Sequence, residues 1–342
     1  MGKTTCRLQE DLDIKVIFMK VLITGGAGYI GSYTVNLLLK NNFEVFVLDK
    51  VVNNCNGLPN KAKIIVDLAD KNKLEKKLNN QKFDAIVHLA ASIYPGESMI
   101  NPYKYYRNNI IGGLNILEFM RKSSTPYIIN ASSCAVYGSP KKLPVKENEP
   151  TLPESVYGET KLIFESILKH YSENYAIKYT NLRYFNVAGA SVDNDFGIGS
   201  NSESRFIPTL IRSILDKNPI KIYGNNYVTT DGTCIRDYVH VMDVARFHLM
   251  LLRHFKNDIT NETYNLGTGK GHSNYQLVKK AEKIVGKKVV VNFLNRRTGD
   301  VPKIYSDISK ITKDFNFKME YSDIDTIVRS TYEWYLNKRS KL

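Results

Sequence analysis

Short apolar runs alternate with longer stretches of helical spacing in the first half of the chain. Six runs have the length of a strand and are apolar almost throughout, which is typical of strands buried on both faces. We predict strands at 20–24, 44–49, 64–67, 85–89, 127–131 and 178–184. Apolar positions three and four residues apart predict helices over 29–40, 72–78, 105–121 and 156–175. This alternation predicts an α/β fold built on a doubly wound parallel Rossmann sheet.

The pattern changes near residue 186, after which loops rich in Gly, Asn and Asp separate the remaining helices. Those helices are predicted at 205–216, 241–254, 274–285 and 323–336. We therefore expect an N-terminal extension over 1–18, a Rossmann domain over 19–185 and a smaller mixed α/β lobe over 186–342. Some of the C-terminal chain is expected to cross back to the first domain.

Composition excludes several classes of protein. The 342 residues carry a net charge of +14, but the lysines are spread along the chain without interleaved aromatics, so we expect no nucleic-acid partner. No segment of about eighteen residues is free of charge, so no membrane span is expected. The four cysteines are far apart, which predicts free thiols and neither a disulfide nor a metal site. We expect a cytoplasmic protein.

A glycine turn follows the first predicted strand and opens the first predicted helix. Gly25, Gly28 and Gly31 have the spacing that lets a backbone approach a pyrophosphate at a helix N-terminus. Asp49 ends the next strand, where a carboxylate can accept hydrogen bonds from ribose hydroxyls and repel a 2′-phosphate. These positions predict a site for NAD rather than NADP.

Tyr157 and Lys161 are one helical turn apart in a predicted helix, so their side chains share a face. A nearby ammonium group favours ionisation of a phenol, and together with a cationic nicotinamide we expect it to lower the Tyr157 pKa toward neutrality. Ser133, at the end of the preceding strand, is expected to hydrogen-bond the substrate oxygen. The same spacing at Tyr275 and Lys279 lacks a serine before it and is interpreted as a solvated helix face.

The chain resembles the extended short-chain dehydrogenase/reductase family, and within it the UDP-sugar 4-epimerases. The resemblance runs from residue 19 to about 311. It rests on the glycine turn and on the segments His88-Leu-Ala-Ala, Gly96-Glu-Ser, Tyr184-Phe-Asn, Asp231-Gly-Thr-Cys-Ile-Arg-Asp-Tyr, Tyr264-Asn-Leu-Gly-Thr-Gly and Arg296-Arg-Thr-Gly-Asp.

The resemblance implies a set of site residues. Catalysis would use Ser133, Tyr157 and Lys161, and the first two would also contact the substrate. NAD would be bound by these three together with Gly25, Gly28, Tyr29, Ile30, Gly31, Asp49, Asn53, Asp67, Leu68, Leu89, Ala90, Ala91, Asn109 and Tyr184. The UDP-sugar would be bound by Asn186, Arg205, Arg236, Arg297 and Asp300. A homodimer formed through helices 105–121 and 156–175 is also implied.

Three positions depart from the family pattern. Ile93 stands where a lysine or serine is common beside the cofactor, and Arg205 replaces an amide or histidine before the Phe-Ile-Pro segment. Ile304 occupies the position that decides whether N-acetylated sugars fit, and a side chain of intermediate size leaves that question open.

The implied reaction is the interconversion of UDP-glucose and UDP-galactose through transient oxidation at C4. Epimerases of UDP-glucuronate, UDP-arabinose or UDP-N-acetylglucosamine remain alternatives. A dehydratase usually has an Asp-Glu pair after the serine, where this chain has Cys134 and Ala135, and a decarboxylase usually has a glutamate at position 135. A non-catalytic protein that senses NAD or binds RNA would be expected to lack Tyr157 or Lys161.

Overall fold

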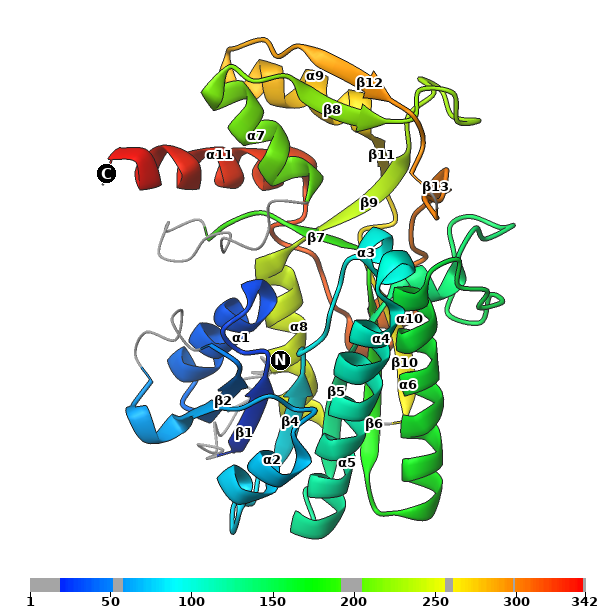
Figure 1. The fold of residues 1–342 in the computed structure, drawn as a ribbon. Coiled ribbons are helices and arrows are strands. Elements are labelled where there is room, and N and C mark those ends of the chain that lie inside the picture. Colours follow the sequence, from blue (N-terminus) through cyan, green and yellow to red (C-terminus); the bar gives the residue numbers. More distant parts are fainter. Residues whose placement is uncertain (1–18, 52–57, 192–204, 256–260, 298, 341–342) are drawn as a thin grey trace, which may run out of the picture.

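The computed structural model describes residues 19–51, 58–191, 205–255, 261–297 and 299–340. Among these residues, no helix is both long enough and apolar enough to cross a membrane. The predicted Asn53 lies outside the described residues. The chain forms a layered lobe around one large sheet and a smaller lobe above the carboxyl ends of its strands (Figure 1).

The large sheet has seven parallel strands in the order β10-β6-β5-β4-β1-β2-β3, which confirms the predicted doubly wound fold. Apart from Ile65 in the edge strand, their apolar residues are buried, because helices cover both faces of a parallel sheet. The strands are β1 (Lys20–Thr24), β2 (Glu44–Asp49), β3 (Lys63–Ile65), β4 (Ala85–His88), β5 (Tyr127–Ser133), β6 (Lys178–Tyr184) and β10 (Glu262–Leu266).

Two groups of helices pack on this sheet. One group comprises α2 (Lys71–Leu78), α5 (Gly112–Ser123) and α6 (Val156–Asn174), with Tyr171 of α6 donating to Glu118 of α5 at 2.8 Å. The other pairs α1 (Tyr29–Lys40) with α8 (Val241–His254), which Thr34 and His248 join by a 2.9 Å hydrogen bond. The short helices are η1 (Asn60–Ala62), α3 (Pro95–Ile100), η3 (Cys134–Tyr137) and α10 (Ser309–Phe315).

The smaller lobe has its own apolar core, in which Leu210, Ile211, Leu277 and Val328 are buried. Strand β9 (Ile235–His240) pairs with β7 (Asn186–Ala188), β11 (Gly271–Ser273) and β13 (Lys303–Ile304), and β8 (Ile220–Tyr223) pairs with β12 (Val291–Leu294). The helices of this lobe are α7 (Phe206–Asp216), α9 (Asn274–Val285) and α11 (Ile324–Ser340).

One predicted helix, 105–121, is interrupted. It consists of α4 (Pro102–Tyr105), a π-helical turn η2 (Tyr106–Ile111) and α5. The wider turn coincides with buried Asn109, whose amide bonds Ser92 N at 2.8 Å, Ser92 O at 3.1 Å and Thr160 Oγ1 at 3.0 Å. Such π turns are frequent at functional sites, and this one ties the helix to the loop after β4.

The chain crosses back between the lobes after residue 186. Helix α8 covers the large sheet beside α1, and β10 extends that sheet next to β6. Residues after 185 therefore contribute to both lobes.

Candidate active site

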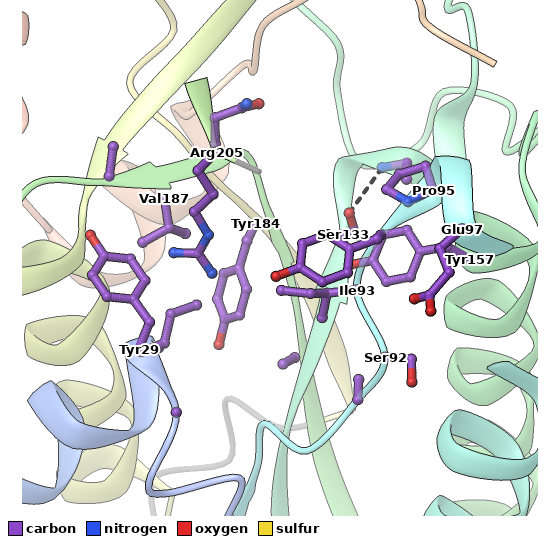
Figure 2. Close-up of a pocket in the computed structure, with 18 of the residues that line it drawn as sticks. Tyr29, Ser92, Ile93, Pro95, Glu97, Ser133, Tyr157, Tyr184, Val187 and Arg205 are labelled. Atoms are coloured by element: carbon purple, nitrogen blue, oxygen red, sulfur yellow. Dashed lines mark hydrogen bonds between the residues drawn. The ribbon is translucent and has the colours of Figure 1, made fainter. Parts of the chain in front are cut away.

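One large pocket lies between the two lobes. Its walls include the glycine turn, the loops after β4 and β5, the start of α6, and residues of β9 and β13. Figure 2 shows Tyr29, Ser133, Tyr157, Tyr184 and Arg205 pointing into it. All the predicted site residues that the structure describes line this pocket except Asn109, whose buried side chain holds the adjoining loop at Ser92.

The backbone of the glycine turn packs so closely that side chains at Gly25 and Gly31 would not fit. Gly25 has φ of +70°, and a Cβ there would lie 2.7 Å from the nitrogen of Ala90. A Cβ on Gly31 would lie 2.3 Å from the oxygen of Gly25. Gly28 precedes α1 and provides no side-chain cap, so the first N–H groups of that helix are available to an anion. This cradle fits the diphosphate of a dinucleotide.

Asp49 lies beside the glycine turn at the end of β2. Its carboxylate accepts hydrogen bonds from the main-chain nitrogens of Ala27 at 3.1 Å and Lys50 at 2.7 Å. Burial raises the pKa of Asp49, and these hydrogen bonds oppose that shift. The carboxylate therefore braces the turn and still borders the pocket, where a ribose could reach it.

Asp67 and Leu68 line the pocket after β3. Burial favours the neutral carboxyl of Asp67, but hydrogen bonds from Ala69 N and Arg107 outweigh it, so the Asp67 pKa is lowered. Arg107 lies 2.9 Å and Lys50 lies 3.3 Å from this carboxylate. Leu89, Ala90 and Ala91 form the neighbouring wall after β4.

Ser133 and Tyr157 come together from the end of β5 and the start of α6. The Ser133 hydroxyl accepts a hydrogen bond from Ala135 N at 3.2 Å, and it lies close enough to the Tyr157 hydroxyl to favour the phenolate. Tyr157 is the second residue of α6, whose first turn Ser155 caps, and its main-chain N–H donates to Ser98 Oγ at 3.0 Å. The backbone thus fixes the phenol in the wall of the pocket beside the serine.

Lys161 has a different partner from the one expected. Its ammonium nitrogen donates to the carbonyl of Ala131 at 2.6 Å and lies 6.0 Å from the centroid of the Tyr157 ring. Burial lowers the Lys161 pKa to about 8, and Glu165 opposes this. Burial also raises the pKa of Tyr157 to about 12, and the nearby Ser133 hydroxyl opposes this shift. The protein alone therefore raises the phenol pKa, because desolvation exceeds the stabilisation of the phenolate. The lowered pKa expected with a cationic nicotinamide bound stays a prediction.

Tyr184 is held by two residues that the sequence did not indicate. Its hydroxyl lies 2.6 Å from His248 Nε2, and His248 Nδ1 lies 2.9 Å from Thr34 Oγ1. Burial lowers the His248 pKa to about 3, so the imidazole is neutral and can bridge two hydroxyl groups. Helical spacing predicts that position 248 is buried but gives no sign of its partners.

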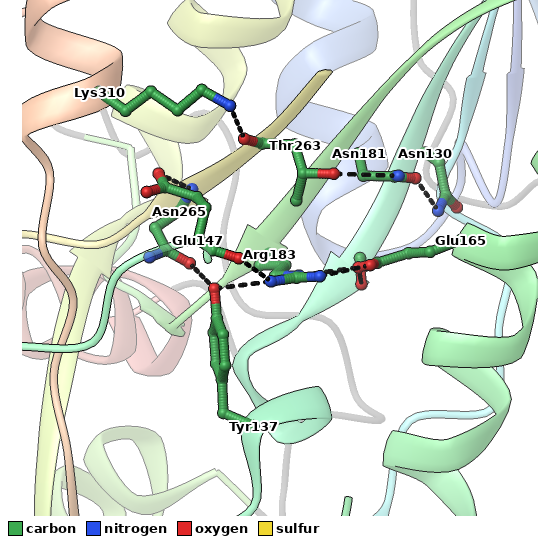
Figure 3. Close-up of polar contacts among 10 residues, drawn as sticks. Asn130, Tyr137, Glu147, Glu165, Asn181, Arg183, Thr263, Asn265 and Lys310 are labelled. Carbon is green, nitrogen blue, oxygen red and sulfur yellow. Dashed lines mark hydrogen bonds and ion pairs between the residues drawn. The ribbon is translucent and has the colours of Figure 1, made fainter. Parts of the chain in front are cut away.

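A second polar network that the sequence did not indicate supports the end of β5. Glu165 of α6 accepts two hydrogen bonds from Arg183 of β6 at 3.0 and 2.6 Å (Figure 3). It also accepts one from the Ser132 hydroxyl. Arg183 donates to Tyr137 at 2.9 Å as well. Arg183 lies within the predicted strand 178–184, and a buried charge requires a partner. The sequence could therefore have predicted that Arg183 is paired, although not with which residue.

The predicted substrate residues border the other side of the pocket. Asn186 begins β7, and Arg236 of β9 lies 3.9 Å from the carboxylate of Asp300. The Arg297 guanidinium lies 3.5 Å from the centroid of the Tyr223 ring. These charged and aromatic groups could hold a nucleoside diphosphate.

The departures at positions 93 and 304 also lie in the pocket. Ile93 is partly exposed there and offers no hydrogen bond from its side chain, whereas Ile304 is buried against Val136, Tyr137 and Phe185. Each isoleucine therefore makes its part of the wall apolar.

Comparisons with known proteins agree with this geometry. Residues 21–267 match the NAD dependent epimerase/dehydratase family. A UDP-glucose 4-epimerase of Lactobacillus helveticus is 37% identical over 320 residues, which cover 93% of this chain and 97% of that protein.

Two solved structures are similar over nearly their whole length. The UDP-glucose 4-epimerase from Brucella ovis in complex with NAD is 38% identical with a TM-score of 0.84, covering 92% of this chain and 98% of that one. The UDP-glucose 4-epimerase from Bifidobacterium longum, in complex with NAD+ and UDP, is 32% identical with a TM-score of 0.87. The match covers 94% of this chain and 100% of that one.

Proposed function

The chain belongs to the NAD dependent epimerase/dehydratase family, and on this premise we propose that it interconverts UDP-glucose and UDP-galactose. The observation that carries the proposal is the pairing of Tyr157 with Ser133 in the pocket that the glycine turn borders. A phenol beside a dinucleotide site has the position needed to move a proton while a hydride moves.

Binding of the dinucleotide is assigned to the glycine turn and its neighbours. Gly25, Gly28 and Gly31 leave room for the diphosphate, and Asp49 and Asp67 lie where adenosine would follow. Tyr184, fixed by His248, and Asn109, which holds the loop at Ser92, border the nicotinamide end. When bound, NAD would accept the hydride from the sugar C4 and return it to the opposite face.

The protein's own groups handle the proton and the rest of the substrate. Tyr157 would take the proton of the sugar 4-hydroxyl, directly or through Ser133, and give it back after the sugar has turned. Lys161 would keep a positive charge near the phenol and hold the end of β5 through Ala131. Asn186, Arg236, Arg297 and Asp300 would anchor UDP, because arginines suit a diphosphate.

The neighbouring residues do not favour loss of water or carbon dioxide. A dehydratase needs an acid and a base beside the serine, and Ala135 can be neither. Burial raises the Cys134 pKa to about 12, so its thiol is not ionised near neutrality. A redox cycle that returns the hydride to C4 needs no group at these two positions.

We also propose a homodimer. Exposed apolar side chains gather on α3, α4 and η2, with Ile100 86% and Tyr103 72% exposed, and Met99, Tyr106 and Ile111 also accessible. These elements pack against α6, so a pair of helices per subunit could form the interface. Sedimentation at low protein concentration tests it, and a monomer at micromolar concentration would refute it.

A cytoplasmic location is proposed on the state of the thiols. Cys134 and Cys234, the cysteines in the part of the chain that the structure describes, are both free. Reduced thiols are usual where glutathione keeps cysteines reduced.

The activity can be tested by incubating the purified enzyme with a panel of UDP-sugars and no added reductant, and separating the products by chromatography. Conversion of UDP-glucose to UDP-galactose, with no net NADH formed, is expected. Formation of a dehydrated sugar, or no reaction with UDP-glucose, would contradict the proposal.

A further inference from the structure

Arg205 holds a fixed place at the start of α7. Its main chain is extended, with φ of −81° and ψ of 138°, and its carbonyl accepts from Thr209 N at 3.1 Å and Thr209 Oγ1 at 2.9 Å. The side chain therefore begins from a rigid helix end in the smaller lobe. It lines the pocket between the lobes.

The guanidinium of Arg205 packs against Tyr29, in the glycine turn of the opposite lobe. Its central carbon is 4.3 Å from the centroid of the Tyr29 ring, and Figure 2 shows it on the side of the pocket where Tyr29 and Tyr184 lie. Tyr29 is itself fixed, since its hydroxyl donates to Gly189 O and its ring packs against Tyr33 at 5.7 Å. Tyr29 is the first residue of α1, the helix whose N-terminus borders the cradle for a diphosphate.

No anion neutralises this guanidinium within the described residues. Its Nη1 atom is buried and has no hydrogen-bond partner there, and the groups that interact with its charge are the phenols of Tyr29, Tyr94 and Tyr157. Burial accordingly lowers the Arg205 pKa. Two other cations in the pocket do have anionic partners, in the pairs of Lys50 with Asp67 and of Arg236 with Asp300.

A buried cation without a partner is costly, and proteins normally offset that cost with an anion. The ring face of Tyr29 stabilises the charge only in part. The apolar side chain of Ile93 in the same pocket provides no competing ligand. An anion that enters the pocket next to Tyr29 would neutralise the charge of Arg205.

We propose that Arg205 binds the diphosphate of the dinucleotide, reaching from the smaller lobe to the glycine turn. The inference rests on the proposed binding of NAD. It assigns Arg205 to the cofactor and not to the UDP-sugar, because the guanidinium lies on the first residue of α1. The residues proposed for UDP, in contrast, belong to β7, to β9 and to the segment before β13.

The decisive experiment compares ligand affinities of the dinucleotide-free protein and its Arg205→Gln variant. Titrations with NAD, with ADP-ribose and with UDP are followed by isothermal calorimetry. Loss of a charge-assisted hydrogen bond should weaken NAD and ADP-ribose about 10- to 100-fold, while UDP affinity changes less than about twofold. Arg297→Gln is the matched control, and it should weaken UDP and leave NAD unchanged.

Thermal melting separates a ligand role from a structural one. Without ligand, the Arg205→Gln protein should melt no lower than the wild type, because it loses an unpaired buried charge. Saturating NAD should raise its melting temperature less. Arg205→Lys keeps the charge but not the planar fork, and an intermediate NAD affinity is expected.

Two results would overturn the inference. One is unchanged NAD affinity in Arg205→Gln, whether or not UDP binding falls. The other is a lower melting temperature of the ligand-free variant with an unchanged NAD-induced increase. Wild-type protein that binds neither NAD nor ADP-ribose would instead refute the proposed function itself.

Discussion

Lys161 lies 6.0 Å from the centre of the Tyr157 ring and donates its hydrogen bond to a main-chain carbonyl. The positive charge therefore lies near the phenol ring, and the described residues show no hydrogen bond between the ammonium and the Tyr157 hydroxyl. The carbonyl belongs to Ala131, two residues before Ser133, so Lys161 also positions the end of β5. Both effects converge on the phenol that we propose as the catalytic base.

Replacing Tyr157 with Phe should abolish most turnover and leave the cofactor bound. Removal of a general acid–base group typically costs about 10²- to 10⁴-fold in rate. The measurement is kcat with UDP-glucose, together with the amount of NAD that copurifies. Tyr275→Phe is the control, since Tyr275 has a lysine four residues later on a helix of the smaller lobe. Near-normal turnover of Tyr157→Phe would show that another group is the base.

The Tyr157 phenol should remain protonated in the dinucleotide-free protein up to strongly alkaline pH. Its pKa of about 12 follows from burial, which favours the neutral form. An ultraviolet difference spectrum between wild type and Tyr157→Phe should thus show no phenolate at pH 9. NAD, which brings a cationic ring, should shift the phenolate signal to lower pH. A phenolate band at pH 9 without NAD would contradict this prediction.

Asp49→Ala should weaken NAD binding and reduce discrimination against NADP. The variant loses the proposed ribose acceptor, its negative charge and the hydrogen bond from Ala27 N. We expect a cost of about 1–3 kcal/mol, or roughly 5- to 150-fold in affinity. Calorimetry with both dinucleotides measures it. Asp84→Ala is a suitable control, because Asp84 accepts from Lys20 N at the start of β1, the opposite end of that strand from the glycine turn. Unchanged NAD affinity in Asp49→Ala would remove Asp49 from the site.

Gly31→Ala should prevent dinucleotide binding. The new methyl group would lie 2.3 Å from the oxygen of Gly25, and backbone atoms cannot yield as the end of a side chain can. We expect a lower melting temperature and no NAD retained. Gly96→Ala is the matched control, since a Cβ there meets nothing within 4 Å. Equal NAD binding by both variants would disprove the close packing of the turn.

Acid should destabilise the protein through buried neutral histidines. His248 and His88 have pKa values of about 3, and His240 of about 4, because burial disfavours the charged ring. In the unfolded chain histidine titrates near 6.5, so stability is full above that pH and declines as pH falls toward 3. Each such histidine contributes a slope of about 1.4 kcal/mol per pH unit.

The variant His248→Gln tests this slope. Denaturant titrations between pH 6 and 4.5 should give a pH dependence shallower than wild type by about 1.4 kcal/mol per unit. His170→Gln, a change on the exposed surface of α6, should leave the slope unchanged. An unaltered slope in His248→Gln would mean that this histidine is already protonated in the native protein.

Local sequence signals predicted the parts of the site that depend on neighbouring residues. The strand–glycine–helix order placed Gly25, Gly28 and Gly31, and helical spacing placed Tyr157 and Lys161 on one face. These local signals did not predict features that depend on residues distant in the sequence. The spacing in 105–121 is helical throughout, yet Asn109 bonds Ser92 and Thr160, and a π turn lies at that position.

Distant contacts also determine the pKa of Tyr157 in the protein without a cofactor. The sequence shows a lysine at the right spacing, but not the Ala131 carbonyl that binds it or the burial that raises the phenol pKa. Likewise, the sequence presents Arg205 as an unusual residue before α7. Only the fold places its guanidinium on the ring of Tyr29.

Strand β10 pairs with β6 along five residues, from Glu262 with Thr180 to Leu266 with Tyr184. During synthesis, β6 leaves the ribosome well before β10 exists, and much of the smaller lobe is translated in between. Until then β6 presents an open edge to other chains. The large sheet can therefore be completed only after the chain through β10 has been synthesised. A nascent chain that stalls or ends before β10 would be prone to aggregate.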